Sequence, residues 1–283
     1  MSCFFFEKLY NYCMIIEYPN GEAFIKDNSS FLNENKYLSA FFYIDAPLLT
    51  KRNKKNYVFK VSSNDKTLLA LKVEPYNLLL YGDKECLEDL LLFLLNNNFE
   101  VDGVNCSTII GNALLDMSEK ILGKTYKLLI GMDFMEAKEI SEESSNEVTV
   151  PTADDVEEIY QCMINFFTDC GLPDKPSKEK IRDTISSFRI IRMDNKIVSL
   201  SKKSPDTDVS IRVVTVYTRP EYRNKGLARK VVNYVKNEII NEGKIATLNV
   251  DQANPISYHL YTSLGFKKAF SQGVYIVNKT TSD

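Results

Sequence analysis

The sequence predicts an α/β protein with a mixed, mostly antiparallel sheet and helices on both of its faces. Two observations in the second half of the chain lead to this fold class. Three β-rich runs follow one another at 188–193, 196–202 and 208–218, and the short turns between them favour antiparallel pairing. A helical pattern at 226–242 then leads to a strand at 244–251, and a crossover of this kind makes two neighbouring strands parallel.

The remaining elements of the second half complete this arrangement. Thr152 is a suitable N-cap for a helix that ends near Gly171, because its hydroxyl can accept from free N–H groups of the first turn. The other predicted elements are helices at 177–187 and 255–264 and a strand at 266–277.

The first half echoes the element order of the second, although no sequence similarity between the halves decides the matter. We therefore expect a related but degenerate lobe, with an unrelated α/β lobe as the alternative. Apolar residues with helical spacing fill 20–50, and Gly123 suits a helix C-cap. The other elements predicted there are strands at 57–62, 67–73, 78–81 and 125–130 and helices at 83–95 and 107–122.

Composition suggests where the domains divide. Residues 136–147 are mostly charged or small and polar, which is typical of a linker; an exposed loop inside one domain is the alternative. The predicted division is a possible disordered N-terminal extension at 1–13, a degenerate lobe at 14–135, the linker at 136–147 and a second domain at 148–283.

The bulk composition excludes several classes of protein. The 283 residues include 35 Lys and Arg against 38 Asp and Glu, so a general nucleic-acid binder is not expected. No apolar run reaches the roughly 18 residues of a membrane span. The six cysteines form no C-x-x-C pair and the chain has one histidine, so we expect no metal site. Scattered thiols without a secretory signal indicate a cytoplasmic protein.

One segment suggests chemistry. A β-branched strand at 213–218 leads into the basic turn 219–226, and a helix opens at Gly226. Backbone N–H groups at such a helix start have no partner inside the helix and can bind phosphate oxygens. Arg223 and Lys225 add positive charge. The sequence therefore predicts an anion site, with a solvated basic turn as the alternative.

Two motifs around this segment resemble those of a known family. The run 223–228, Arg-Asn-Lys-Gly-Leu-Ala, resembles the Q/R-x-x-G-x-G/A pyrophosphate loop of the GNAT superfamily of N-acetyltransferases. Asn254, Leu260-Tyr261 and Leu264-Gly265-Phe266 are similar to the closing motif of that superfamily, N-x(5)-L-Y-x-x-L-G-F. The resemblance covers residues 147–277 and is tightest over 213–266.

The resemblance implies the GNAT α/β fold, in a two-lobed form with a degenerate N-terminal half, and acetyl-coenzyme A as the acyl donor, without a metal. Strands near 213–218 and 245–250 would splay apart and hold the pantetheine arm between them. Amides of 224–229 would bind the pyrophosphate. The residues that the resemblance assigns to coenzyme binding are Val216, Tyr217, Thr218, Arg223, Asn224, Lys225, Gly226, Leu227, Ala228, Arg229, Asn254, Ser257 and Tyr261.

The implied reaction is transfer of an acetyl group to a primary amine of a small molecule or an amino acid, by direct attack of the amine on the thioester. Tyr261 matches the general acid of the family and would protonate the leaving thiolate; a Tyr that only packs the helix is the alternative. Two other functions remain open: a non-catalytic acyl-CoA-binding or regulatory protein on the same fold, and a structural or interaction protein.

The general base and the acceptor are less well defined. The strand at 211–216 carries no acid, so water, an amine that arrives neutral, Asp208, Asp251 or His259 would have to serve as the base. The slight acidic excess suits a cationic acceptor. Arginines at 212, 219 and 223 suit a carboxylate-bearing one. Either a monomer or a homodimer is compatible with the sequence.

Overall fold

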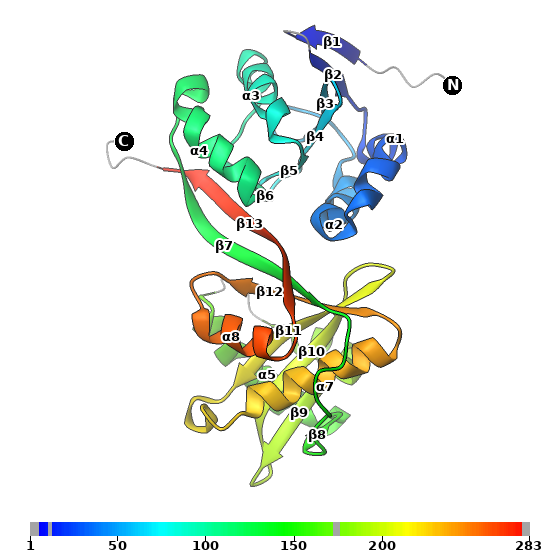
Figure 1. The fold of residues 1–283 in the computed structure, drawn as a ribbon, viewed down its shortest axis with the longest axis vertical. Helices are drawn as coiled ribbons and strands as arrows, with labels where there is room; N and C mark the ends of the chain where they lie inside the picture. The colour runs from blue at the N-terminus through cyan, green and yellow to red at the C-terminus, as the bar shows by residue number, and fades with distance from the viewer. Residues whose placement is uncertain (1–5, 11–12, 172–175, 279–283) are drawn as a thin grey trace. The chain divides into compact units, whose positions relative to one another are not determined.

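The chain divides into two compact units (Figure 1). The computed structural model describes residues 6–10, 13–171 and 176–278. The first unit comprises residues 1–133, 251–253 and 270–283, and the second comprises residues 134–250 and 254–269.

The second unit contains the mixed sheet that the sequence predicts. Its strands follow the hydrogen-bonded order β7, β12, β11, β10, β9, β8. Pairing is antiparallel between β8 and β9, β9 and β10, and β10 and β11, and parallel between β11 and β12. The strands are β7 (Tyr126–Ala137, shared with the first unit), β8 (Val148–Thr149), β9 (Phe188–Met193), β10 (Lys196–Pro205), β11 (Ser210–Thr218) and β12 (Ile245–Asp251).

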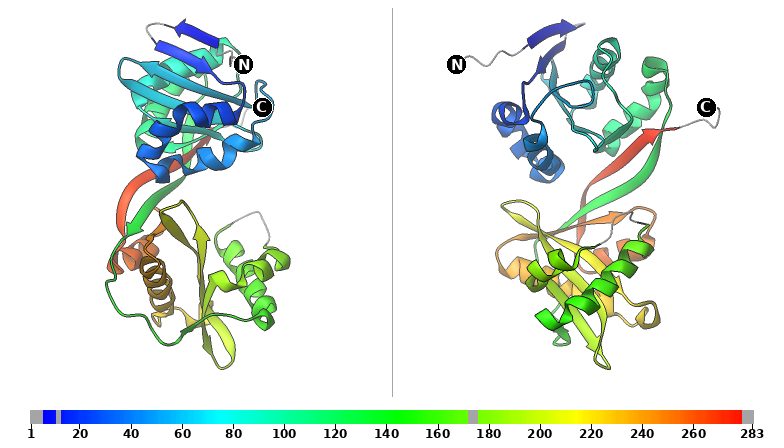
Figure 2. Two further views of the ribbon diagram at one scale, coloured as in Figure 1. Left: turned by 90° about the vertical axis from the view of Figure 1, so that its right-hand side faces the viewer. Right: turned by 180° about the vertical axis from the view of Figure 1, so that it is seen from behind.

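Helices cover both faces of this sheet, with α7 on one side and α5 and α6 on the other (Figure 2). Successive strand residues point to opposite faces, so Ile191 packs in the core under α7 while Ile190 packs in the core under α5. The helices are α5 (Val156–Asp169), α6 (Lys178–Asp183), α7 (Leu227–Asn241) and α8 (Pro255–Ser263).

Sequence explains where these helices form. The short 3₁₀ turn Ala153–Asp155 precedes α5 and has a capping box, in which the Thr152 N–H donates to the Asp155 carboxylate at 2.8 Å. On α7, Val231 and Val235 are one helical turn apart and fully buried. Each such side chain stabilises the fold by about 1.5–3 kcal/mol.

The segment predicted as a linker, 136–147, has definite contacts. Its first two residues complete β7, and its carbonyls are bound by α7. Asn233 donates to the carbonyls of Glu142 and Glu143, and Asn237 donates to that of Glu142. These contacts fix part of the segment to α7, while most of its polar side chains are exposed.

Buried Lys236 on α7 is part of the same contact. Its ammonium donates to the Ser141 hydroxyl at 2.7 Å and to the Leu264 carbonyl at 2.8 Å, so it joins the segment to the end of α8. Burial lowers the pKa of this lysine.

The first unit has strands in the hydrogen-bonded order β1, β2, β3, β4, β5, β6, β13, β7. The strands that do not enter the second unit are β1 (Phe6–Tyr10), β2 (Cys13–Glu17), β3 (Tyr57–Ser63), β4 (Lys66–Lys72), β5 (Leu78–Gly82) and β6 (Gly103–Ser107); β13 (Lys267–Val277) has residues in both. The helices are α1 (Gly21–Glu34), α2 (Lys36–Asp45), α3 (Leu87–Asn96) and α4 (Thr108–Leu122).

The two units repeat one element order, as the sequence suggests. From β2 to β7 the elements run strand, two helices, three strands, helix, strand, helix, strand, and the order from β8 to β13 is the same. The α1–α2 pair and the α3–α4 pair each pack on their own core, as α5–α6 and α7 do in the second unit.

The boundaries differ from the predicted ones at both ends of the chain. Residues 6–10, expected in a possible disordered extension, form β1 and pair with β2; residues 1–5 and 11–12 of that extension lie outside the described residues. Residues 270–283, expected in the second domain, belong to the first unit, because β13 pairs with β6 from Gln272 to Ile276.

No helix in the described ranges is long and apolar enough to cross a bilayer. Nor do His, Cys, Asp and Glu side chains of that part of the chain gather in a group of three or more that would hold a metal ion.

Candidate functional site

The parallel strands β11 and β12 separate partway along their length. Within the described chain, their ladder joins three residue pairs, from Ser210 with Ile245 to Arg212 with Thr247. Strand β11 continues to Thr218 and β12 continues to Asp251. Beyond the last pair, the facing edges of both strands therefore carry backbone groups that an extended ligand can bond.

A β-bulge lies in β11 just beyond this point. Strand β10 pairs Leu200 with Tyr217 and Lys202 with Val214, so two residues of β11 lie opposite Ser201 alone. The first of the two, Thr215, has φ of +54°. Left-handed backbone is rare for a β-branched residue and costs roughly 1–2 kcal/mol. Backbone strain of this kind is concentrated at functional sites, so the bulge indicates that this stretch of β11 belongs to one.

The turn after β11 shapes its backbone for an anion. Asn224 and Gly226 both have positive φ, of +62° and +74°, on either side of Lys225. Alternation of this kind turns successive N–H groups toward one point, which makes a nest for anions. A Cβ placed on Gly226 would meet no atom within 4 Å, so the space above the nest is open.

The start of α7 favours negative charge at the same place. Its first turn contains no acidic residue and includes Arg229, while Leu227 is buried and anchors the turn to the core. The N–H groups of a first helical turn lack intrahelical acceptors, and the helix dipole adds partial positive charge. The arrangement suits a phosphate or pyrophosphate group.

Most of the predicted cations near the nest already have partners. Arg223 donates to the Thr218 carbonyl at 3.1 Å and to the Asp169 carboxylate at 2.5 Å. Arg229 donates to the hydroxyl of Ser263 and forms an ion pair with Glu142. These two side chains therefore hold the loop and the helix start in place as much as they supply charge.

Lys225 is exposed, and its ammonium lies 4.9 Å from the centre of the Tyr222 ring. Ala228 is half-buried and keeps the helix start small. The backbone of the loop, rather than its side chains, is thus the main anion-binding feature.

The closing motif forms the helix α8. Asn254 is its N-cap, and the Asn254 side chain accepts from the Ser257 N–H at 3.0 Å. Tyr261 is 8% exposed and packs edge-on against Phe266, with ring centroids 6.1 Å apart. Both rings belong to the core under α7, which also contains residues of β11 and β12.

The Tyr261 phenol is held in its protonated form. Burial, with a smaller contribution from Cys170, raises its pKa to about 12, and a hydrogen bond with Ser257 opposes the shift. A phenol that stays protonated at neutral pH can donate a proton to a departing anion. It cannot act as a base there.

None of the three expected base candidates has a geometry that singles it out. Asp251 accepts from the Ala253 N–H at 2.8 Å and closes a local turn. The carbonyl of Asp208 accepts from Lys244 at 2.5 Å, and the residue is exposed. His259 is exposed on α8.

The arginines expected near the acceptor are not a free cluster. Each forms an ion pair with a carboxylate, so none offers an uncompensated charge to an acceptor. The pairs are Arg212 with Asp206, Arg219 with Glu158 and Arg223 with Asp169.

The remaining predicted residues lie along β11. Val216 and Thr218 are half-buried, and Tyr217 is buried among residues of the α5 core. Thr218 shares a hydrogen bond with Ser199 at 2.9 Å. In the structure, β11, the nest and Tyr261 all belong to the second unit.

Two features of the site were not predicted. The bulge at Thr215 leaves no mark in a β-branched run, and the sequence does not show that Cys170, at the end of α5, helps to raise the pKa of Tyr261. In the sequence, only Gly171, which follows Cys170, indicates that α5 ends there.

Known proteins resemble this chain in sequence over part of its length and in fold over most of it. Residues 207–275 match a family model described as FR47-like protein. A GCN5-related N-acetyltransferase from Sphaerobacter thermophilus is 13% identical, with 95% of this chain and 96% of that chain covered and a TM-score of 0.61. The chain has the GNAT fold.

Two further structures resemble this chain over nearly their whole length. A GNAT-family acetyltransferase from Colwellia psychrerythraea is 13% identical, covers 94% of this chain and 99% of its own, and has a TM-score of 0.56. A Drosophila protein is 10% identical, with 91% and 95% covered and a TM-score of 0.52. No curated protein matches the chain.

Proposed function

We propose that the second unit binds acetyl-coenzyme A and transfers its acetyl group to a primary amine of a small molecule or an amino acid. The observation that carries this proposal is the gap between β11 and β12, which opens beside the nest at Asn224 and Gly226. A gap with free backbone edges suits an extended diamide, and the nest suits a pyrophosphate. Coenzyme A joins these two groups in one molecule.

Each part of the coenzyme would meet a different set of residues. The pantetheine arm would bond backbone groups of Val216 and Thr218 on β11, with Tyr217 holding the strand in the core and Asn254 and Ser257 orienting the arm from α8. The pyrophosphate would bond amides of 224–229. Lys225 would add charge at the open side of the nest, since Arg223 and Arg229 are engaged elsewhere.

In the reaction, the neutral amine attacks the carbonyl carbon of the thioester, the carbon–sulfur bond breaks and the sulfur leaves as a thiolate. Tyr261 would donate its phenol proton to that sulfur, and solvent would return a proton to the tyrosine. The proton lost by the amine nitrogen would pass to water. Water is the acceptor we favour because the carboxylates near β11, those of Glu158, Asp169 and Asp206, are each bound by an arginine.

Release of free thiol from acetyl-CoA, measured with a panel of primary amines, tests this proposal. Stabilisation of the protein by coenzyme A is measured in parallel by thermal melting. Thiol release that depends on the amine supports transfer. Stabilisation without release from any amine favours the alternative of a non-catalytic acyl-CoA-binding protein. Neither stabilisation nor release at millimolar coenzyme would contradict the proposal altogether.

A further inference from the structure

The first unit contains its own pair of separating strands. Strands β5 and β6 hold the places in the repeat that β11 and β12 hold in the second unit. In the described chain their parallel ladder joins only Leu78 with Val104 and Leu79 with Asn105. Strand β5 runs on to Gly82 and β6 to Ser107. Their outer edges pair with β4 and β13, so the inner edges alone lack a neighbouring strand beyond the ladder.

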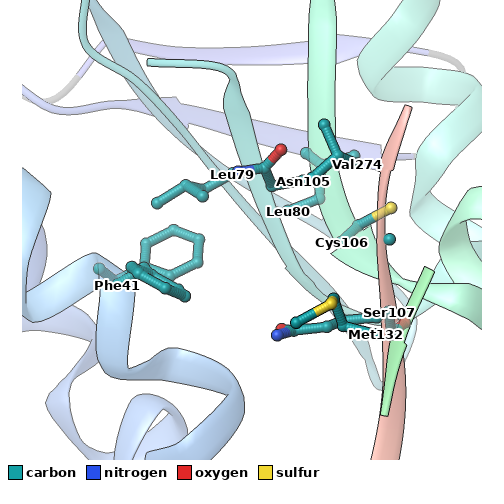
Figure 3. Close-up of a pocket in the computed structure, with 11 residues that line it drawn as sticks. Phe41, Leu79, Leu80, Asn105, Cys106, Ser107, Met132 and Val274 are labelled. Atoms are coloured by element: carbon teal, nitrogen blue, oxygen red, sulfur yellow. The ribbon is translucent and has the colours of Figure 1, made fainter. Parts of the chain in front are cut away.

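A cavity of about 150 Å³ lies at this gap (Figure 3). Its lining comes from both faces of the sheet. Leu79 belongs to the core under α1 and α2, whereas Leu80 and Cys106 belong to the core under α3 and α4. Phe41 of α2 lies on one side of the cavity and Cys106 of β6 on the other. The cavity therefore occupies the space between the strands, where two separate cores meet. We call it the β5–β6 cavity.

The lining of the β5–β6 cavity is neutral. None of the eleven described residues that line it carries a charge, and most are aliphatic or aromatic. Burial raises the pKa of the Cys106 thiol to about 12, so it is uncharged as well. Asn105 and Gln272 supply uncharged hydrogen-bonding groups. An ionic ligand would lose its hydration here without gaining a counter-charge, which is strongly unfavourable.

The turn beside this gap also disfavours phosphate. Where the second unit has the nest, the first has Asp83, whose carboxylate accepts from the Thr67 N–H at 3.0 Å and from Lys66 at 3.2 Å. The first turn of α3 contains Glu88 and Asp89, whereas that of α7 contains no acid. The acidic side chains at this turn and in the first turn of α3 therefore make the local electrostatic field unfavourable for phosphate.

We propose that the β5–β6 cavity binds a small uncharged amide, in which one amide group carries short alkyl chains on both sides. Free strand edges need a partner with both a donor and an acceptor, and the amide supplies both. The apolar walls take the alkyl chains. The site is independent of the acetyl-CoA site, and it gives the degenerate half a ligand of its own.

Ligand-observed NMR with the full chain tests the charge preference. The probe is N-butylacetamide, and hexylamine and hexanoate are a cation and an anion of similar length. We expect the amide to bind about tenfold or more tightly than either charged probe, since each charged one must desolvate an ion. Equal binding of the three would overturn the proposal, as would displacement of the amide by saturating coenzyme A.

Two phenylalanine variants on β13 test the location. Val274 lines the cavity, while Ile276, two residues along the same face of the strand, does not. Val274→Phe fills the cavity and is expected to weaken the binding of N-butylacetamide about tenfold or more. Ile276→Phe should leave the affinity unchanged. If Val274→Phe binds the amide as tightly as the wild type does, the proposal is overturned.

A measurement on the wild type covers the case in which Val274→Phe does not fold. Alkylation by iodoacetamide is followed by mass spectrometry at Cys106, in the cavity, and at Cys170, which is exposed in the second unit. Saturating N-butylacetamide should slow the alkylation of Cys106 and leave that of Cys170 as it was. An unchanged rate at Cys106 would contradict binding in the β5–β6 cavity.

Discussion

Replacement of Gly226 by alanine tests the anion nest apart from the stability of α7. Gly226 has φ of +74°, and an added Cβ meets no atom within 4 Å, so alanine clashes with nothing in the protein. The strain of a left-handed alanine lowers the free energy of unfolding by roughly 1–2 kcal/mol. The new methyl group also points into the open space where a phosphate would approach.

Gly243, which follows the other end of α7, provides a matched control. Its φ is +73° and an added Cβ there likewise meets no atom within 4 Å. Gly243→Ala therefore carries the same backbone strain without touching the nest. For both variants we expect the melting temperature to fall by about 2–4 °C for each kcal/mol lost.

Only Gly226→Ala is expected to weaken the binding of coenzyme A. Loss of one charge-assisted hydrogen bond costs about 1.5–3 kcal/mol, which corresponds to roughly 10–100-fold in affinity for coenzyme A. Pantetheine lacks the pyrophosphate, so its affinity should stay the same. Isothermal titration of both ligands into the two variants measures this. An equal loss of affinity for coenzyme A in both variants would contradict binding of the pyrophosphate by the nest. So would equal losses of affinity for pantetheine and for coenzyme A in Gly226→Ala.

Three further substitutions give distinct expected outcomes. Tyr261→Phe should lower kcat about tenfold or more with little change in acetyl-CoA affinity, and unchanged turnover would remove its role as proton donor. Because burial raises the pKa of Tyr261 to about 12, ionisation of the phenol should not reduce wild-type turnover until the pH approaches that value. A loss of turnover at a lower pH that is absent in Tyr261→Phe would contradict this prediction. Asn233→Ala removes the side-chain donor to the Glu143 carbonyl, whereas the Glu142 carbonyl keeps its bond from Asn237. The variant should therefore lower the free energy of unfolding by about 0.5–1.5 kcal/mol in a denaturant melt, where no change would count against that contact. Arg223→Ala should weaken the binding of coenzyme A only about threefold or less, because the Arg223 guanidinium is already paired with Asp169. If titration shows that the affinity falls tenfold or more, the guanidinium must leave Asp169 to bind the phosphate.

Local patterns were enough to predict most of the second unit. The helix expected at 226–242 is α7 at Leu227–Asn241, and the strand expected at 244–251 is β12 at Ile245–Asp251. These elements have a clear periodicity and strong boundaries. Among the residues of the candidate site, Gly226 was expected from the local sequence at the start of a helix. Asn254 was expected only from the resemblance to a family, and its place as the N-cap of α8 came from the structure.

Elements whose stability comes from distant partners were missed. Strand β6, Gly-Val-Asn-Cys-Ser, is short and polar, and its place in the sheet depends on pairing with β13 at the other end of the chain. Strand β2 likewise depends on β3. Single-strand patterns do not contain this information.

Contacts between side chains of different elements also could not be predicted from the sequence. The pairing of Arg223 with Asp169 depends on the end of α5 meeting the turn after β11. The separation of β11 from β12 came only from the resemblance to a family, because neither strand carries a residue that marks the last pair. The neutral lining of the β5–β6 cavity likewise gathers residues from five elements.

Titration of acetyl-CoA into the full chain tests the central claim most directly. We expect one bound molecule per chain, because the nest and the free strand edges occur together in the second unit, while Asp83, Glu88 and Asp89 disfavour phosphate in the first. Absence of binding at millimolar acetyl-CoA would contradict the assignment of the site. Two bound molecules per chain would contradict the electrostatic distinction between the two units.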